Sequence, residues 1–95
     1  MTPTDQKGSF FFDPKDSIYK DHFPGLPVVP GSLIIEAFLK VIEQEEIHPM
    51  AIKRFRFKTF ISPGSYTYKL VINAGVIDCY LLRNGQKLAT GKILL

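Results

Sequence analysis

Residues 32–44 have the sequence SLIIEAFLKVIEQ, and this segment fits the period of a helix better than any other part of the chain. At about 100° per residue, four of its polar side chains share about 80° of the helix circumference. These side chains belong to Ser32, Glu36, Lys40 and Glu43. The remaining circumference is apolar, so the rest of the chain must cover it. Ser32 is placed to cap the N-terminus of this helix, and residues 45–49 end it.

After the helix, the sequence changes to a period of two residues, which is typical of strands with one buried face. Between residues 51 and 59, basic side chains alternate with apolar ones, so Phe55 and Phe57 are predicted to point inward and the basic side chains outward. Three further strands are predicted at 66–73, 76–82 and 87–94. We expect the four strands to pair in the order of the sequence, as a meander.

Short turn signals separate these strands. Residues 62–65, SPGS, predict a turn, and Asn84-Gly85 predicts a two-residue hairpin because both of its central positions need a positive φ. Gly91 interrupts the last strand, which indicates a β-bulge or the close approach of another group. Cys79 lies in the middle of a strand and is predicted to be a small buried side chain.

The N-terminal third of the chain is less regular. Residues 1–8 are expected to be a flexible lead-in, and residues 9–12 a short strand. Residues 13–31 contain four prolines, each of which removes a backbone donor and restricts the residue before it. We therefore predict a long ordered loop without regular structure. Together the elements predict an α+β fold, in which one domain over residues 9–95 curls an antiparallel sheet around one helix.

Length and charge set further limits. A chain of 95 residues forms one domain, whose small core makes self-association an expectation. Residues 1–50 carry four basic and eight acidic side chains, a net charge of −4, whereas residues 51–95 carry eight basic side chains and one acidic, a net charge of +7. This asymmetry indicates an anionic partner, or head-to-tail pairing between copies of the chain.

Several classes of protein are excluded by the composition. The sequence lacks the run of about 18 apolar residues that a membrane-spanning helix requires. Its polar N-terminus lacks the features of a secretory signal. The single cysteine, Cys79, cannot form a disulfide framework or a Cys-based zinc site, and it suits a reducing cytoplasm. The two histidines, His22 and His48, cannot supply a His-rich metal cluster.

Candidate chemistry is concentrated between His22 and Glu36. His22 lies in the proline-rich loop, where it is either a general base or an ordinary loop histidine. Gly31 lies where the helix begins, so a ligand oxygen can approach the free N–H groups there. Glu36 interrupts an apolar block, which predicts a raised pKa suited to a general acid. The alternative for Glu36 is an ion pair with Lys40, one turn further along the helix. A base, an acid and an oxyanion donor are the groups needed for proton abstraction next to a carbonyl.

Residues 21–38, DHFPGLPVVPGSLIIEAF, closely resemble the signature of the 3-hydroxyacyl-[acyl carrier protein] dehydratases of fatty acid synthesis. Residues 55–57 and 62–65 resemble the strand and the Pro-Gly turn of the same family, so the resemblance extends over roughly residues 9–95. It implies the hot-dog fold, in which an antiparallel sheet wraps a long central helix. It also implies dehydration of a 3-hydroxyacyl thioester to the trans-2-enoyl thioester, in fatty acid or in specialised acyl or polyene synthesis.

The same resemblance assigns roles to individual residues. His22 would take the C2 proton of the substrate, and Glu36 would protonate the departing 3-hydroxyl group. The Gly31 N–H would bind the thioester oxygen, and the Val28 carbonyl would hold the second nitrogen of His22. The remaining members of the expected substrate-binding loop are Phe23, Gly25 and Pro30.

The resemblance further implies an assembly and a substrate carrier. In this family the histidine and the glutamate of one site come from two subunits, so we expect a homodimer or a higher oligomer. The substrate would be carried on the phosphopantetheine arm of acyl carrier protein and would enter a tunnel along the subunit interface. Loss of water is acid–base chemistry, so no metal or redox cofactor is expected.

The basic side chains of the strand after the helix leave three alternatives open. Lys53, Arg54, Arg56 and Lys58 are either a solvated face, a docking site for an acidic acyl carrier protein, or a nucleic-acid site. The last is disfavoured, because bases stack on exposed aromatic side chains and Phe55 and Phe57 are predicted to point inward. Two rival functions remain: an acyl thioesterase on the same fold, and a non-catalytic, acyl-carrier-binding partner of a larger dehydratase.

Overall fold

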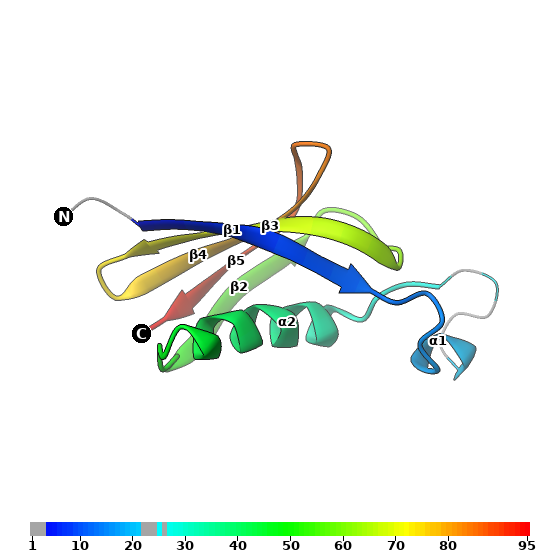
Figure 1. Ribbon diagram of the computed structural model, residues 1–95, viewed down its shortest axis with the longest axis horizontal. Coiled ribbons are helices and arrows are strands. Elements are labelled where there is room, and N and C mark those ends of the chain that lie inside the picture. The colour runs from blue at the N-terminus through cyan, green and yellow to red at the C-terminus, as the bar shows by residue number, and fades with distance from the viewer. Residues whose placement is uncertain (1–3, 22–24, 26) are drawn as a thin grey trace.

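The computed structural model describes residues 4–21, 25 and 27–95 of the chain, and in this part it contains five strands and two helices. The elements are β1 (Thr4–Phe12), α1 (Ile18–Asp21), α2 (Gly31–Gln44), β2 (Ala51–Phe57), β3 (Gly64–Asn73), β4 (Val76–Arg83) and β5 (Gln86–Leu94). All the strands join in one antiparallel sheet, and α2 lies across one face of it (Figure 1). The predicted α+β class and the predicted position of the main helix are confirmed.

The strand order in the sheet is β1-β3-β4-β5-β2. β3, β4 and β5 form the predicted meander, but the predicted place of β2 beside β3 is wrong. β1 already occupies that edge of β3, pairing from Thr4 with Ile72 to Phe12 with Gly64. β2 therefore crosses to the opposite edge of the sheet, where it pairs with β5.

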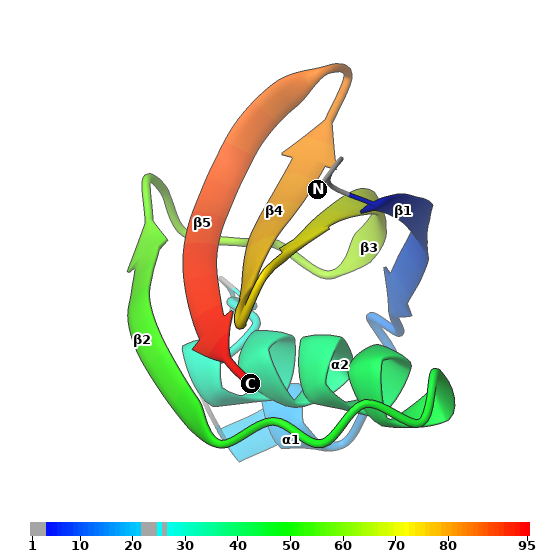
Figure 2. The same cartoon turned by 90° about the vertical axis from the view of Figure 1, so that its left-hand side faces the viewer.

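The sheet curves over α2, with β1 and β2 at its two sides (Figure 2). Ile34, Phe38 and Ile42 recur at every fourth position and are buried against the sheet, as expected for the face of a helix that packs on a core. The sheet contributes the other fully buried large side chains, among them Leu70, Ile77, Cys79, Leu81 and Ile93. The fold is thus hot-dog-like, but the long central helix implied by the resemblance is not found, because α2 has 14 residues.

The start of α2 differs from the prediction in one detail. Pro30 occupies the N-cap position, and no side chain caps the helix there. Ser32, the expected cap, is already inside the helix and exposed. Proline suits the beginning of a helix because its fixed φ matches the helical value and it has no N–H to leave unpaired.

A β-bulge in β2 keeps the apolar side chains of this strand on the inner face. Lys53 pairs with Lys92 and Arg56 pairs with Thr90, so two residues of β2 lie opposite Gly91. The extra residue is Arg54, whose φ is 53°. If Arg54 instead continued the regular alternation that runs from Ile52, Phe55 would turn outward. The close approach predicted at Gly91 is confirmed, because a Cβ there would lie 2.5 Å from the Phe55 ring.

The N-terminal region is more regular than predicted. β1 begins at Thr4, not at Ser9, and the predicted irregular loop contains the short helix α1. The side chain of Asp16 accepts a hydrogen bond from the N–H of Ile18 (3.1 Å), which stabilises the first turn of α1. Asn84 and Gly85 have φ values of 52° and 76°, which confirms the predicted hairpin. In the part of the chain that the structure describes, no helix is long and apolar enough to cross a membrane.

Candidate functional site

The segment that enters α2 is held firmly against the segment that follows β2. The N–H of Val29 donates to the carbonyl oxygen of Ile61 (2.7 Å), and both side chains are buried. Inside the helix, Leu33 and Ile34 donate to the carbonyl oxygen of Pro30 (3.0 and 3.4 Å). The N–H groups of Gly31 and Ser32 precede this first helical bond, and they lie at the positive end of the helix dipole.

A groove of about 300 Å³ opens beside this helix start. One wall consists of residues 28–31, and the other contains Phe57, Thr59, Phe60 and Ile61. The lining is mostly carbon, and Phe60 is 79% exposed. The arrangement suits a ligand that combines a polar carbonyl with an apolar chain, because N–H donors and apolar walls lie side by side.

Gly31 keeps the groove open at the point where the N–H groups begin. A Cβ at this position would lie 3.0 Å from Cε2 of Phe57, closer than side chains normally pack. Glycine therefore allows the Phe57 ring to cover the backbone of the helix start. The prediction that Phe57 points inward is confirmed in direction, although its side chain remains 38% exposed.

Glu36 does not line this groove. It lies on the face of α2 opposite Ile34 and Phe38, its side chain is 54% exposed, and its carboxylate pairs with Lys40 (3.3 Å). The ion pair considered as the alternative in the sequence is thus present. The carboxylate is not buried within the single chain, although the apolar block around it had led us to expect burial. The apolar side chains that the sheet covers lie on the other side of α2.

The expected site residues are only partly brought together. The structure places Val28, Pro30 and Gly31 in one wall of the groove. Gly25 lies upstream, exposed, with a φ of 84°. His22 and Phe23 fall outside the described residues. Within the described residues, no group of three His, Cys, Asp or Glu side chains is arranged to hold a metal ion.

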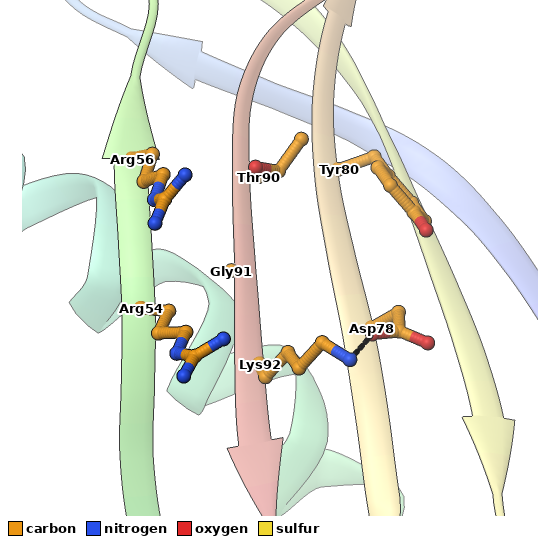
Figure 3. A pocket seen from close by; sticks show the side chains of 7 residues that line it. All are labelled: Arg54, Arg56, Asp78, Tyr80, Thr90, Gly91 and Lys92. Carbon is orange, nitrogen blue, oxygen red and sulfur yellow. Dashed lines mark ion pairs between the residues drawn. The ribbon is translucent and has the colours of Figure 1, made fainter.

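The basic side chains of β2 are exposed, and the bulge directs Arg54 and Arg56 to the outer face of the sheet. There they line a second cavity, together with side chains of β4 and β5 (Figure 3). Sequence reasoning missed these neighbours, Tyr80, Thr90 and Lys92, because they meet Arg54 and Arg56 only through the strand order. It also missed Phe60, although an aromatic side chain in a short polar loop was an available signal.

Cys79 lies on the inner face of the sheet and is fully buried, as predicted. Burial, and to a smaller extent the nearby Asp78 carboxylate, raises the pKa of the Cys79 thiol to about 12. A thiol of this kind is a packing element and is poorly suited to act as a nucleophile.

The chain is similar to dehydratases both in sequence and in fold. The family profile described as ApeI dehydratase matches residues 2–83. The 3-hydroxyacyl-[acyl-carrier-protein] dehydratase FabZ of Lactiplantibacillus plantarum is 32% identical over 81 residues, which cover 67% of this chain and 54% of the relative. The chain therefore spans about half the length of that relative.

The fold is shared with a chain of the dehydratase heterocomplex ApeI:P from Xenorhabdus doucetiae. The TM-score is 0.74, the match covers 99% of this chain and 97% of the other, and the sequences are 19% identical. At this identity the likeness shows a common fold.

Proposed function

The chain belongs to the ApeI dehydratase family, and from this premise we propose that it dehydrates a 3-hydroxyacyl thioester carried by acyl carrier protein. The observation that carries the proposal is the groove at the start of α2, where the N-terminal backbone of the helix at Gly31 lies beside apolar walls. The N–H groups suit a thioester oxygen that gains negative charge, and the walls suit an acyl chain or a pantetheine arm.

The proposed reaction is an elimination of water. His22 removes the C2 proton of the substrate, and the electron pair of that C–H bond forms the C2–C3 double bond. Glu36 gives a proton to the 3-hydroxyl group, which leaves as water. The Gly31 N–H stabilises the thioester oxygen while the C2 carbon carries negative charge. This sequence is acid–base chemistry, so we propose that the chain needs no metal or redox cofactor.

The position of Glu36 supports a site shared between two copies of the chain. Glu36 points away from its own sheet and away from the groove beside its own Gly31. A second copy would bring a Glu36 carboxylate and a groove together, with His22 from one subunit and Glu36 from the other. The exposure of large apolar side chains is consistent with such an interface, since a partner would cover them. They are Phe11, Met50, Ile52, Phe57 and Phe60.

We further propose that an acidic acyl carrier protein docks on the basic side chains of β2. Lys53, Arg54, Arg56 and Lys58 are all exposed, and β2 leads directly into the wall of the groove at Phe57. Charges of this kind increase the rate of association more than the final affinity.

A second candidate function is that of a non-catalytic partner subunit. One observation favours it: the fold matches a chain of a dehydratase heterocomplex. In this case a different chain would supply the acid, the base or both.

Mass spectrometry of carrier-bound 3-hydroxyacyl chains of several lengths tests the proposal through the loss of one water. Glu36→Gln is expected to reduce this loss about 100-fold or more, while the matched variant Glu43→Gln retains it. Glu43 lies on the same exposed side of α2, so the control changes the same charge away from the proposed chemistry. Release of a free thiol without loss of water would indicate a thioesterase instead.

Two further outcomes separate the candidates. Mixing His22→Ala with Glu36→Gln is expected to restore part of the activity, because hybrid dimers contain one intact site. Absence of recovery despite confirmed subunit exchange would contradict a shared site. Absence of dehydration by the unmodified chain at every acyl length would contradict the catalytic homodimer and support the partner-subunit function.

A further inference from the structure

The outer face of the sheet carries a cavity of about 320 Å³, and its lining includes Arg54 and Arg56, two of the side chains proposed above to dock the carrier protein. Arg54 and Arg56 come from β2, Thr90 and Lys92 from β5, and Asp78 and Tyr80 from β4, with Gly91 between them (Figure 3). The neighbours of these residues along β4 and β5, including Cys79 and Ala89, are buried on the inner face. The cavity thus lies on the side of the sheet opposite α2.

The bulge in β2 is what brings two guanidinium groups into this cavity. Arg54 adopts a φ of 53°, a conformation that residues with a side chain rarely adopt and that glycine adopts freely. The chain nevertheless places an arginine there. Because Arg54 is the extra residue of the bulge, its side chain joins that of Arg56 on the outer face, beside the backbone of Gly91.

The charges in the cavity are unbalanced. Three cationic side chains, Arg54, Arg56 and Lys92, face one carboxylate, that of Asp78. Asp78 pairs with Lys92 (3.7 Å). Among the described residues, no carboxylate forms an ion pair with Arg54 or Arg56. Lys53 pairs in register with Lys92 and adds a further positive charge at the edge of the cavity.

The donors around the cavity match an anion with several oxygens. Each guanidinium offers N–H groups in a planar fork that suits a phosphate or a carboxylate. Thr90 and Tyr80 also line the cavity, but the Tyr80 side chain extends away from the two guanidinium groups (Figure 3), and the Lys87 ammonium lies 4.4 Å from the centre of its ring. Two guanidinium forks and the Lys92 ammonium offer more donors than the two oxygens of one carboxylate can accept, whereas a phosphate has more oxygens to share among them.

We propose that this cavity is a binding site for a phosphoryl group, separate from the dehydratase site. Phosphate monoesters and phosphodiesters share this chemistry, so the group belongs either to a free phosphorylated metabolite or to the phosphate that links pantetheine to a carrier protein. The proposal stands on the cavity and its charges, and therefore does not depend on the dehydratase activity.

Titration of the ¹⁵N-labelled chain with inorganic phosphate tests the site. The ionic strength is held constant with chloride. Saturable amide shifts are expected at residues 54–56 and 90–92. Arg54→Gly removes the guanidinium and keeps the bulge, and Arg56→Gln removes the other. Each is expected to weaken binding about 10-fold or more, because hydrogen bonds to charged groups are the strong ones. Lys15→Gln, an equal change of charge at an exposed turn, is expected to leave binding unchanged.

Shifts that do not saturate, or that weaken equally in Lys15→Gln, would overturn the proposal and leave an ordinary solvated basic face. A comparison of pantetheine 4′-phosphate with inorganic phosphate then identifies the source. Tighter binding of pantetheine 4′-phosphate, with additional shifts at the Gly31 groove, supports the carrier arm as the source. Equal binding, with shifts confined to the outer face, supports a free phosphorylated metabolite.

Discussion

Two glycines of the molecule lie under two aromatic side chains of β2, with different consequences. Phe57 covers Gly31 at the start of α2, and Phe55 covers Gly91 in the middle of the sheet. At Gly31 the partly exposed ring borders an apolar groove at the N-terminus of the helix. At Gly91 the ring fills the inner side, and the outer side of the same strands carries a cavity among charged side chains. One strand therefore shapes two unlike sites, a dipolar one on the inner side and a cationic one on the outer side.

The inner face of the sheet is buried, whereas the groove is open. The largest expected effect on stability is therefore at the buried Cys79, the register partner of Gly91. Its folded-state pKa is about 12, above the ordinary value of 9.0. Below pH 9 the thiol is protonated in both states, whereas above pH 9 only the unfolded state ionises. The contribution of this thiol to the free energy of unfolding should therefore fall by about 1.4 kcal/mol per pH unit between pH 9 and 12.

Chemical denaturation of the wild type and of Cys79→Ala measures this effect by difference. The advantage of the wild type is expected to decrease over this pH range, because the variant lacks the titrating thiol. A constant difference from pH 8 to 11 would mean that the inner face of the sheet is hydrated.

A cysteine introduced by Thr59→Cys, in the wall of the groove, is expected to react with iodoacetamide at pH 8 while Cys79 does not.

A methyl group at Gly91 tests how tightly Phe55 fills the inner side. Gly91→Ala would place Cβ 2.5 Å from the ring, and such overpacking is expected to lower the free energy of unfolding by about 2 kcal/mol. Thermal unfolding measures the loss. The double variant with Phe55→Leu is expected to recover part of it, since the two changes share one contact. Strict additivity of the two losses would show that Phe55 does not rest on Gly91.

Arg54 allows the backbone of the bulge to be separated from its charge. Arg54→Gly and Arg54→Ala remove the same side-chain charge, but only glycine adopts the left-handed conformation without strain. Arg54→Gly is therefore expected to be more stable than Arg54→Ala by about 1 kcal/mol in urea denaturation. Equal stabilities would mean that the chain in solution does not hold the bulge at this position.

Gly31→Ala is expected to have the smallest effect on stability. Alanine is a better helix former than glycine, and Phe57 is exposed enough to move away from a new Cβ at 3.0 Å. The free energy of unfolding should change by less than about 1 kcal/mol, while dehydration falls because the groove narrows beside the N–H groups. If Gly31→Ala lowered the free energy of unfolding as much as Gly91→Ala does, the two glycines would be packed equally tightly against their aromatic rings.

The sequence predicts those features that depend on neighbouring residues. The apolar pattern of residues 32–44 places α2 within one residue of its observed start, and Asn84-Gly85 predicts its hairpin correctly. The bulge also had a local signal, because Ile52 and Phe55 are three positions apart and cannot share one face of a regular strand. The start of α1 also had a local signal, because Asp16 can accept a hydrogen bond from the N–H of Ile18. The prolines of this region nevertheless led to the prediction of an irregular loop.

Features that depend on strand order were beyond the sequence pattern. The edge that β2 occupies is determined by β1, whose partner β3 lies about sixty positions away along the chain. The outer cavity follows from that order, since Arg56 meets Thr90 only when β2 lies beside β5. The exposure of Glu36 is a similar case. The apolar block around it predicts a buried helix, but it does not tell which side of that helix the sheet covers.

The register of the sheet also has a consequence for the order in which the chain folds. β3, β4 and β5 pair through short turns, so their contacts close small loops at low entropic cost. Pairing of Thr4 with Ile72 and of Ala51 with Leu94 closes much longer loops. We therefore expect the three-stranded meander to form early and both edges of the sheet to form late. The groove at Gly31 and the cavity at Arg54 both need β2 at its edge, so neither site exists until folding is nearly complete.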